Sequence, residues 1–389
     1  MKTVINYIKS NLIYILLPLI PLIEGLFFEP YWNFKVNGNT FPFLQGIILF
    51  FYLFFKRNNL INLGGLILYI ILLNIIIFVK YPENFAYIII IFLSYLLIKE
   101  RNILLNYEHL KAFVISYSII TVLIYFFRLN QYAFDLIRTR SGSNIYGSNE
   151  LTGILLILAT YSFYSGKIKE KDSIIFIFLF LFFSVLFIRR VSLVASVILL
   201  ILFLLLKFSR VIFSRKIFKA LIAVFVPSVI MYYIFSKFDF FDSIMLRFSS
   251  AETNSGSFSG FIEDTSYLRS LLWDDGIKLF KENVLFGIGA GNFKYYSFQS
   301  NAHSLFINNL AEFGILFGSL INIIYLIPLL KITISNISIS NKILAFSSYL
   351  FFLMIANISG INLFQNTGYV SAFSTLGFFF IIKFISKTK

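Results

Sequence analysis

Residues 173–206 read SIIFIFLFLFFSVLFIRRVSLVASVILLILFLLL, and the charged residues in this run are Arg189 and Arg190 alone. The apolar stretch on either side of the two arginines approaches the ~20 residues that a helix needs to cross a bilayer. Neither stretch alternates between apolar and polar residues, as a strand of a membrane barrel would. The run therefore predicts two membrane-spanning helices joined by a tight turn.

The rest of the chain has the same character. Hydrophobic residues make up 59% of the 389 residues and charged residues 13%, whereas soluble domains average ~45–50% and ~25%. A soluble domain has too little interior to bury so much apolar surface, and within a bilayer only helices and closed barrels satisfy the backbone. We predict an all-α fold, a polytopic membrane helix bundle of about twelve helices. The spans are placed at 11–28, 41–55, 60–79, 85–99, 110–127, 150–165, 173–188, 191–206, 216–236, 303–330, 342–356 and 368–385.

The basic residues predict an orientation. Most of the 33 lysines and arginines fall in short segments that share one side if both termini are cytoplasmic, as the positive-inside rule requires. Residues 128–149 and 237–302 then form long segments on the outer side. A loop as long as 237–302 should carry its own structure, and an amphipathic pattern predicts a helix near 266–282, over the mouth of the bundle. We treat 1–389 as a single membrane domain.

Several classes of chemistry are excluded by composition. The chain has no cysteine, which excludes disulfides, thiolate nucleophiles and cysteine metal sites. Its histidines are His109 and His303, too few for a multi-histidine metal site. The chain contains no Asp-x-Asp motif and no phosphate-binding P-loop, so a metal-dependent nucleotide-sugar transferase or an ATPase is disfavoured. We expect no metal and no cofactor, and we attribute the net charge of +15 to basic cytoplasmic loops and not to nucleic-acid binding.

The densest group of chemically capable residues lies in two neighbouring stretches. Residues 266–293 read SYLRSLLWDDGIKLFKENVLFGIGAGNF, and residues 301–318 read NAHSLFINNLAEFGILFG. The glycines of the first stretch predict a tight turn that lets backbones approach closely. In the second, His303 opens a helix on which Ser304, Asn308 and Glu312 share one polar stripe. Such a stripe marks either a cavity or a polar clamp between helices, and His303 serves either catalysis or contact with lipid headgroups.

The arginines on the predicted outer side, which lie there against the charge bias, include Arg189, Arg190, Arg247 and Arg269. Arginine forks bind phosphate oxygens in two-point fashion, so a lipid diphosphate would account for them. The competing interpretation for Arg189 and Arg190 is a turn between two helices with arginines that reach the interface. For the arginines of the long loop, it is ordinary surface ion pairs with Glu252, Glu263 or Asp264.

These stretches resemble the O-antigen polymerase and O-antigen ligase superfamily of bacterial envelope glycosyltransferases. The matching residues are Arg269, Trp273, Gly287, Gly289, Gly291, Phe293, His303, Glu312, Gly314 and Gly318. Upstream, SGSNIYGSNELTG is similar to a glycine-rich helix entry of the family at Gly142, Gly147 and Asn149, with Ser148 where the family usually has proline. FIRRVSLVAS resembles a motif in which an arginine caps the outer end of a helix, matched best by Arg190, although Arg189 is also available.

The resemblance implies a C-type glycosyltransferase-like architecture in the bacterial inner membrane, with the active site on the outer face. It implies an inverting, metal-independent transfer that joins lipid-linked repeat units into an O-antigen or capsule. Arg190, Arg269 and Arg247 would then stabilise the polyprenyl diphosphate of the donor glycan, and His303 would activate the acceptor hydroxyl or hold the diphosphate. The further substrate-binding candidates are Arg189, Asn301, Asn308, Glu312, Gly289 and Gly291.

Three alternatives remain open at this point. The first is an O-antigen ligase that transfers the lipid-linked glycan to lipid A–core. The second is a flippase or exporter of lipid-linked sugars, although the chain lacks the matching halves common in transporters. The third is a membrane scaffold, which would not need clustered arginines and a histidine. The expected partners are the glycan donor and acceptor, membrane lipids and a chain-length regulator, with no nucleic acid.

Overall fold

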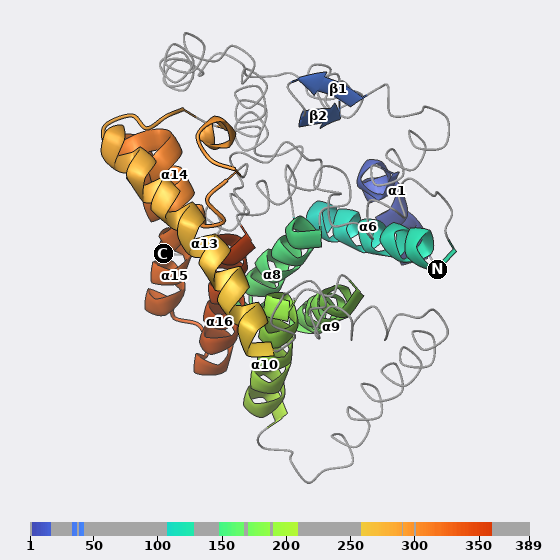
Figure 1. Ribbon diagram of the computed structural model, residues 1–389. Coiled ribbons are helices and arrows are strands. Elements are labelled where there is room, and N and C mark those ends of the chain that lie inside the picture. Colours follow the sequence, from blue (N-terminus) through green and yellow to red (C-terminus); the bar gives the residue numbers. More distant parts are fainter. Residues whose placement is uncertain are drawn as a thin grey trace, which may run out of the picture.

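The computed structural model describes ten segments of the chain (Figure 1). They are residues 2–16, 33–36, 39–42, 107–127, 148–166, 170–186, 190–208, 258–289, 291–298 and 301–359. The spans predicted at 60–79, 85–99, 216–236 and 368–385 lie outside the described residues, so the count of about twelve is not tested.

Helices occupy nearly all of the described part. The first six are α1 (Lys2–Leu16), α6 (Tyr107–Phe127), α8 (Ser148–Tyr164), α9 (Glu170–Leu186), α10 (Arg190–Phe208) and α13 (Phe258–Glu282). The others are α14 (Leu305–Phe313), α15 (Ser319–Ile334) and α16 (Ile339–Ser359). The run 173–206 is divided between α9, which ends at Leu186, and α10, which begins at Arg190. This run forms helices because a helix satisfies all of its backbone N–H and C=O groups internally, as lipid requires. Its aliphatic and aromatic side chains can then face lipid or pack against one another.

Two helical segments in the described part are long and apolar enough to cross a membrane, namely Leu305–Ile334 and Ile339–Ile358. Shorter apolar helices cover Leu151–Tyr164, Asp172–Leu186 and Val191–Lys207. Together with the composition of the whole chain, these helices indicate a membrane protein.

The core of the bundle forms where α8 packs against α9 and α16 and α10 packs against both. Large aromatic side chains fill it without leaving surface exposed, and they include Phe163, Phe176, Phe180, Phe183 and Phe352. Gly153 lies near the start of α8 and faces the ring of Phe352, near the end of α16. The helices therefore run in opposite directions, so the start of α8 and the end of α16 lie at one end of the bundle.

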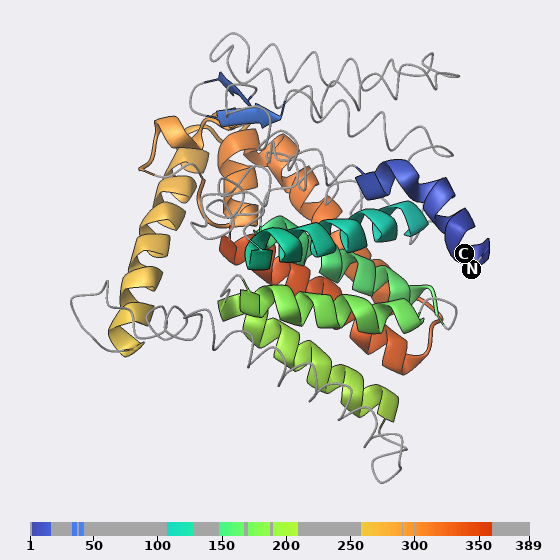
Figure 2. The same cartoon turned by 90° about the vertical axis from the view of Figure 1, so that its right-hand side faces the viewer.

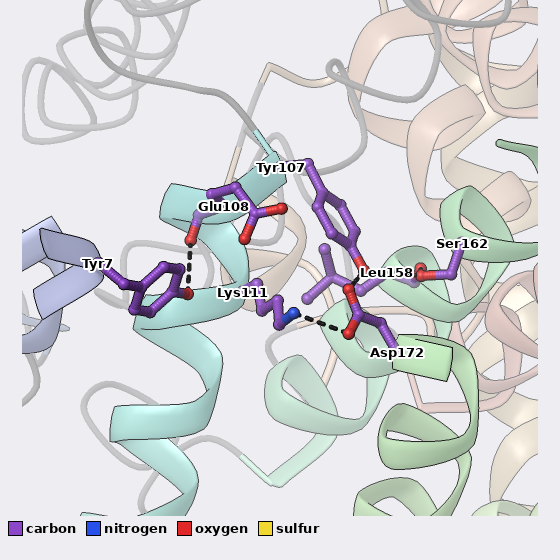
Figure 3. Close-up of polar contacts among 7 residues, drawn as sticks. All are labelled: Tyr7, Tyr107, Glu108, Lys111, Leu158, Ser162 and Asp172. Carbon is purple, nitrogen blue, oxygen red and sulfur yellow. Dashed lines mark hydrogen bonds and ion pairs between the residues drawn. The ribbon is translucent and has the colours of Figure 1, made fainter. Parts of the chain in front are cut away.

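A buried polar cluster joins α6, α8 and α9 at the opposite end (Figure 3). The Tyr107 hydroxyl donates to Asp172 at 2.8 Å and lies 3.0 Å from the Ser162 hydroxyl. Lys111 forms an ion pair with the other carboxylate oxygen of Asp172 at 2.7 Å, and both side chains are mostly buried. Desolvation alone would disfavour these charges, and the paired, hydrogen-bonded arrangement offsets that cost. Asp172 therefore fixes the start of α9 against α6.

Helix α1 attaches to α6 at this same end. The Tyr7 hydroxyl donates to the Glu108 carbonyl at 3.4 Å, and the Ser116 hydroxyl donates to the Ile15 carbonyl at 2.6 Å. Burial raises the pKa of Tyr7 to about 12, and the charges of Glu108 and Asp172 act in the same direction. The phenol therefore remains a neutral donor at physiological pH.

Lysines gather at the end of the bundle that holds Asp172. Helix α9 starts there and α10 returns to it, where Lys207 donates to Asn341 at the start of α16. Lys342 donates to the carbonyl of Thr333 at 3.0 Å, beside the same connection. Lys111, Lys207 and Lys342, three of the basic residues that predicted a cytoplasmic side, thus lie at one end of the described bundle.

Helix α13 is oriented differently from the bundle helices. Figure 2 shows it (yellow) running across the end opposite to the lysines, from the start of α10 towards α14. It includes the residues 266–282 for which a helix was predicted, and it begins earlier, at Phe258.

A short hairpin departs from the all-α prediction. Strands β1 (Asn33–Val36) and β2 (Asn39–Pro42) pair antiparallel, with Asn33 opposite Pro42. The two residues between the strands are Asn37 and Gly38, the pair that most favours a two-residue hairpin loop. The span predicted at 41–55 therefore cannot begin at Phe41, because its first two residues belong to β2.

Candidate active site

The segment predicted as one span at 303–330 is sharply bent. Helix α14 is followed by Gly314, whose φ of +67° only glycine adopts readily. A π-helical turn, η6 (Gly314–Gly318), then leads into α15. The two arms then lie side by side, because Asn322 of α15 donates to the Phe306 carbonyl at 3.1 Å. Asn309 in turn donates to Asn322 at 2.8 Å. Asn309 and Asn322 are 13 positions apart, and an unbroken helix would separate them by about 20 Å.

Three glycines make this bend sterically feasible. A Cβ on Gly318 would lie 2.3 Å from the Asn309 carbonyl oxygen, so only glycine lets the two arms pack this closely. A Cβ on Gly314 would lie 2.4 Å from backbone atoms of Leu285, and one on Gly287 2.4 Å from the backbone of Glu312. The glycine-rich turn after α13 and the bend after α14 therefore pack backbone against backbone.

Four hydrogen bonds connect the turn to the bend. A helix leaves its last carbonyls and its first N–H groups without internal partners, and here the turn supplies them. The N–H groups of Ile288 and Gly289 donate to the carbonyls of Ala311 and Glu312, at 3.0 and 2.9 Å. The N–H groups of Ile315 and Leu316 donate to the carbonyls of Val284 and Leu285, at 2.7 and 3.4 Å. One turn thus caps the end of α14 and the beginning of the helical segment that follows it.

The Glu312 side chain connects the glycine-rich loop at Gly291 to the end of α14. It is buried, and its carboxylate accepts a hydrogen bond from the N–H of Gly291 at 3.0 Å. The N–H of Phe293 and the side chain of Asn308 also hydrogen-bond to it, and the charge of Lys294 acts on it. Glu312 therefore meets a set of backbone donors and a cation within the protein, and its side chain clamps the glycine-rich loop to the end of α14.

Two asparagines hold the backbone N–H groups of His303 and of Ala302, the residue before it. The Asn301 side chain accepts a hydrogen bond from the N–H of His303 at 2.8 Å, and Asn308 accepts one from the N–H of Ala302 at 3.0 Å. His303 has a φ of +47°, in the left-handed region that side chains other than glycine seldom adopt. Such strain persists where the surroundings over-determine the conformation, and it concentrates at functional sites.

Helix α16 fixes the start of α14 directly after His303. The Asn357 side chain accepts hydrogen bonds from the Ser304 hydroxyl at 2.8 Å and from the N–H of Phe306 at 3.5 Å. Ser304 is also the N-cap of α14, since its hydroxyl accepts from the N–H of Ile307. Asn357 was not among the residues singled out from the sequence, because its contact spans 53 positions and no local pattern announces it.

Helix α13 packs one face against α14 and the loop that carries His303. Leu272 and Leu279 are buried on that face. A Cβ on Gly276, between them, would lie 2.5 Å from Ile307 and 3.4 Å from the Cβ of Ala302. Gly276 therefore sets the close approach of α13 to the segment that leads into His303.

Arg269 lies two helical turns before Gly276 on the same face of α13. Its side chain is half-buried, and burial lowers the pKa of the guanidinium. A half-buried guanidinium is stabilised by an anionic ligand, which makes Arg269 a candidate phosphate-binding residue.

The other predicted residues are placed less completely. Arg190 is the first residue of α10 and so lies at the end of the bundle crossed by α13. Arg189 and Arg247 lie outside the described residues. Gly289 and Gly291 both have positive φ, of +94° and +71°, and their N–H groups bond to Glu312.

Comparison with known protein families bears on the segment that contains α9, α10, the glycine-rich loop and His303. Residues 174–321 match the sequence model of the O-antigen ligase family. The match confirms the resemblance. It covers rather more than a third of the chain and includes Arg190, Arg269, His303 and Glu312. No curated protein and no solved structure gave a match.

The helix α13 and the loop packed against it offer two chemical functions. His303 offers an imidazole that can accept a proton near neutral pH, and Arg269 offers a cation for an oxyanion. Among the described residues, no three histidine or acidic side chains gather as a metal site would require.

Proposed function

We propose that the protein joins polyprenyl-diphosphate-linked oligosaccharide repeat units into a surface polysaccharide, on the outer face of the bacterial inner membrane. The observation that carries this proposal is the half-buried guanidinium of Arg269 on α13. It lies on the face of α13 that packs against the His303 loop. The O-antigen ligase match over 174–321 supplies the substrate class.

The reaction is a single displacement. A hydroxyl of the acceptor glycan attacks the anomeric carbon of the donor, a new glycosidic C–O bond forms, and the bond from that carbon to the diphosphate oxygen breaks. The diphosphate leaves with the electron pair, and the configuration at the carbon is inverted. The proton of the acceptor hydroxyl passes to a base, for which we propose the imidazole of His303.

The arginines act on the leaving group. Negative charge on the bridging oxygen grows as the bond breaks, and fixed cations stabilise it more in the transition state than in the bound donor. We assign this role to Arg269 and Arg190, with Arg247 and Arg189 as further contacts to the diphosphate. Arginine suits the role because its planar fork pairs with two phosphate oxygens at once. A metal ion is not required in this scheme.

Asn301, Asn308, Glu312, Gly289 and Gly291 stay in the proposal as the loop framework of the substrate site. Their hydrogen bonds join backbone segments around His303 and the glycine-rich loop. In this arrangement they shape the site and hold its backbone, so a change in them would alter both substrate binding and stability.

The direct experiment uses the purified full-length protein with a synthetic polyprenyl diphosphate glycan and follows product length. We expect polymer to form in the presence of a chelator. Arg269→Lys keeps the charge but loses the fork, so it should slow polymerisation well beyond the exposed Lys278→Ala control on the same helix. Equal rates for both variants would remove Arg269 from the diphosphate site.

Deletion of the gene distinguishes the related activities in the cell. A surface glycan with a single repeat unit and no ladder indicates a polymerase. Loss of all repeats from the lipid A–core indicates a ligase, and accumulation of lipid-linked units inside the cell indicates an exporter. A glycan unaffected by the deletion would contradict the proposal as a whole.

A further inference from the structure

The segment that follows Gly314 carries a continuous exposed apolar stripe. Its residues recur at helical spacing, so they share one face from the first turn to the last. They are Leu316, Leu320, Ile323, Leu326, Leu330 and Ile334, and all are exposed. This segment belongs to a candidate membrane span. Its exposed apolar stripe is therefore the surface that faces lipid.

The stripe does not end where the helical segment begins. The turn after α13 places three consecutive apolar side chains beside it, namely Val284, Leu285 and Phe286, which are 44%, 58% and 47% exposed. Hydrogen bonds from Ile315 and Leu316 to the carbonyls of Val284 and Leu285 make the two surfaces contiguous. Three exposed apolar residues in succession would be unfavourable in water.

Part of the backbone of the turn is hydrogen-bonded within the protein. The Val284 and Leu285 carbonyls are satisfied by the helical segment, and the N–H of Gly287 donates to the Asn283 carbonyl at 2.8 Å. The charged residues Lys281 and Glu282 are exposed just before the turn and belong to α13. A polar-to-apolar boundary therefore falls between Glu282 and Val284.

The length of the helical segment places this boundary in the bilayer. From Ile315 to Ile334 the chain rises by about 30 Å at 1.5 Å per residue, which equals the ~30 Å thickness of the hydrocarbon layer. The first residue of that segment then lies at the edge of the hydrocarbon, and the turn bonded to it lies at the same depth.

We propose that the turn Val284–Phe286 is a membrane anchor, and that its three side chains contact lipid acyl chains at the edge of the hydrocarbon layer. The anchor holds the end of α13 at the bilayer surface. It also fixes the depth of the glycine-rich loop, which begins at Gly287. The proposal concerns the lipid contact alone and does not depend on the reaction proposed above.

The absence of cysteine from the chain permits a direct test. Single cysteines at Leu285, Ile323 and Ser270 are labelled with an environment-sensitive fluorophore in the full-length protein. The protein is reconstituted into vesicles of phosphatidylethanolamine and phosphatidylglycerol. Leu285→Cys probes the anchor, Ile323→Cys the stripe, and Ser270→Cys the exposed surface of α13. Quenching by lipids with a spin label on the acyl chain is compared with quenching by iodide on both sides of the membrane.

The expected result is that labels at 285 and 323 are quenched by the spin-labelled lipid and protected from iodide, with the reverse for 270. At 285 a spin label near the headgroup end of the acyl chain should quench most. Quenching of 285 by iodide, as at 270, would overturn the proposal. Protection from both quenchers would also overturn it, because the turn would then be covered by protein. Phe286→Cys repeats the measurement at a second position and should agree with Leu285→Cys.

Discussion

The carboxylate of Glu312 accepts a hydrogen bond from the backbone N–H of Gly291 at 3.0 Å, although the two residues are 21 positions apart. This contact links the last turn of α14 to the glycine-rich loop. It gives the glutamate of the Glu-x-Gly-x-x-x-Gly motif a structural role close to, but distinct from, the chemistry of His303. It also explains why a buried acidic side chain is tolerated next to a candidate membrane segment, since it is surrounded by donors.

Replacing Glu312 should separate its acceptor role from its charge. Glu312→Ala leaves the N–H of Gly291 buried without a partner, which should lower the free energy of unfolding by about 1–3 kcal/mol. Glu312→Gln keeps an acceptor oxygen and should lose less. Thermal unfolding in detergent, with the oligosaccharide assay in parallel, measures both effects. Identical stability for the alanine variant and the wild type would contradict the clamp.

Gly318→Ala should be far more damaging than an alanine elsewhere in the bundle. The added methyl group would meet the Asn309 carbonyl at 2.3 Å and force α14 and α15 apart, at a cost of about 1–3 kcal/mol. Gly153→Ala is the matched control, because its nearest neighbour is the Phe352 ring at 3.5 Å. We expect a lower unfolding temperature and reduced activity for Gly318→Ala only, and equal behaviour of the two variants would speak against the close packing.

Asn357 should act as a positioning residue for the His303 loop. Asn357→Ala removes the acceptor used by Ser304 and Phe306, so α14 loses support at its start, worth about 1 kcal/mol. A small displacement of His303 should then lower kcat by up to about a hundredfold, with little change in KM. Asn357→Asp keeps the acceptor oxygen and should restore most of the rate. If aspartate were as poor as alanine, the hydrogen bonds would not be the cause.

His303 can be tested without disturbing its unusual backbone. Asparagine tolerates the left-handed conformation better than most residues, so His303→Asn should keep the loop in place while removing the base. We expect polymerisation to fall by ~10²–10⁴ in this variant and in His303→Ala, with expression and membrane insertion unchanged. His109→Ala, at the opposite end of the bundle, should retain activity. A His303→Asn enzyme at near wild-type rate would leave the arginines as the catalytic candidates.

The helices were largely predictable from sequence because apolar runs and charged interruptions report directly on the bilayer. Tyr107–Phe127, Ser148–Tyr164 and Glu170–Leu186 lie over predicted spans to within a few residues. The pair Arg189–Arg190 marked the boundary between α9 and α10. The hairpin at Asn33–Pro42 was missed although Asn37-Gly38 signals it, because the surrounding hydrophobicity favoured helix.

The bend at Gly314 could not be seen in a hydrophobicity pattern. Residues 303–330 are mostly apolar, and glycine is common in membrane helices, so the pattern suggested a single span. The break depends on partners supplied by Val284–Gly289, which no local window contains. The same holds for Asn357, whose contact with Ser304 arises only when α16 returns to the start of α14. Arg269 and His303 were singled out from the sequence because they lie within a recognisable motif.

The four hydrogen bonds between the glycine-rich turn and the bend run entirely through the main chain. Their existence therefore places few demands on the side chains at Val284, Leu285, Ile288, Ala311, Ile315 and Leu316, beyond an apolar character where they are exposed. The glycines at 287, 314 and 318 are constrained far more strictly, since no side chain fits there. A saturation library across this region should tolerate no substitution at these glycine positions, while the exposed positions Val284, Leu285, Ile315 and Leu316 should vary among aliphatic residues.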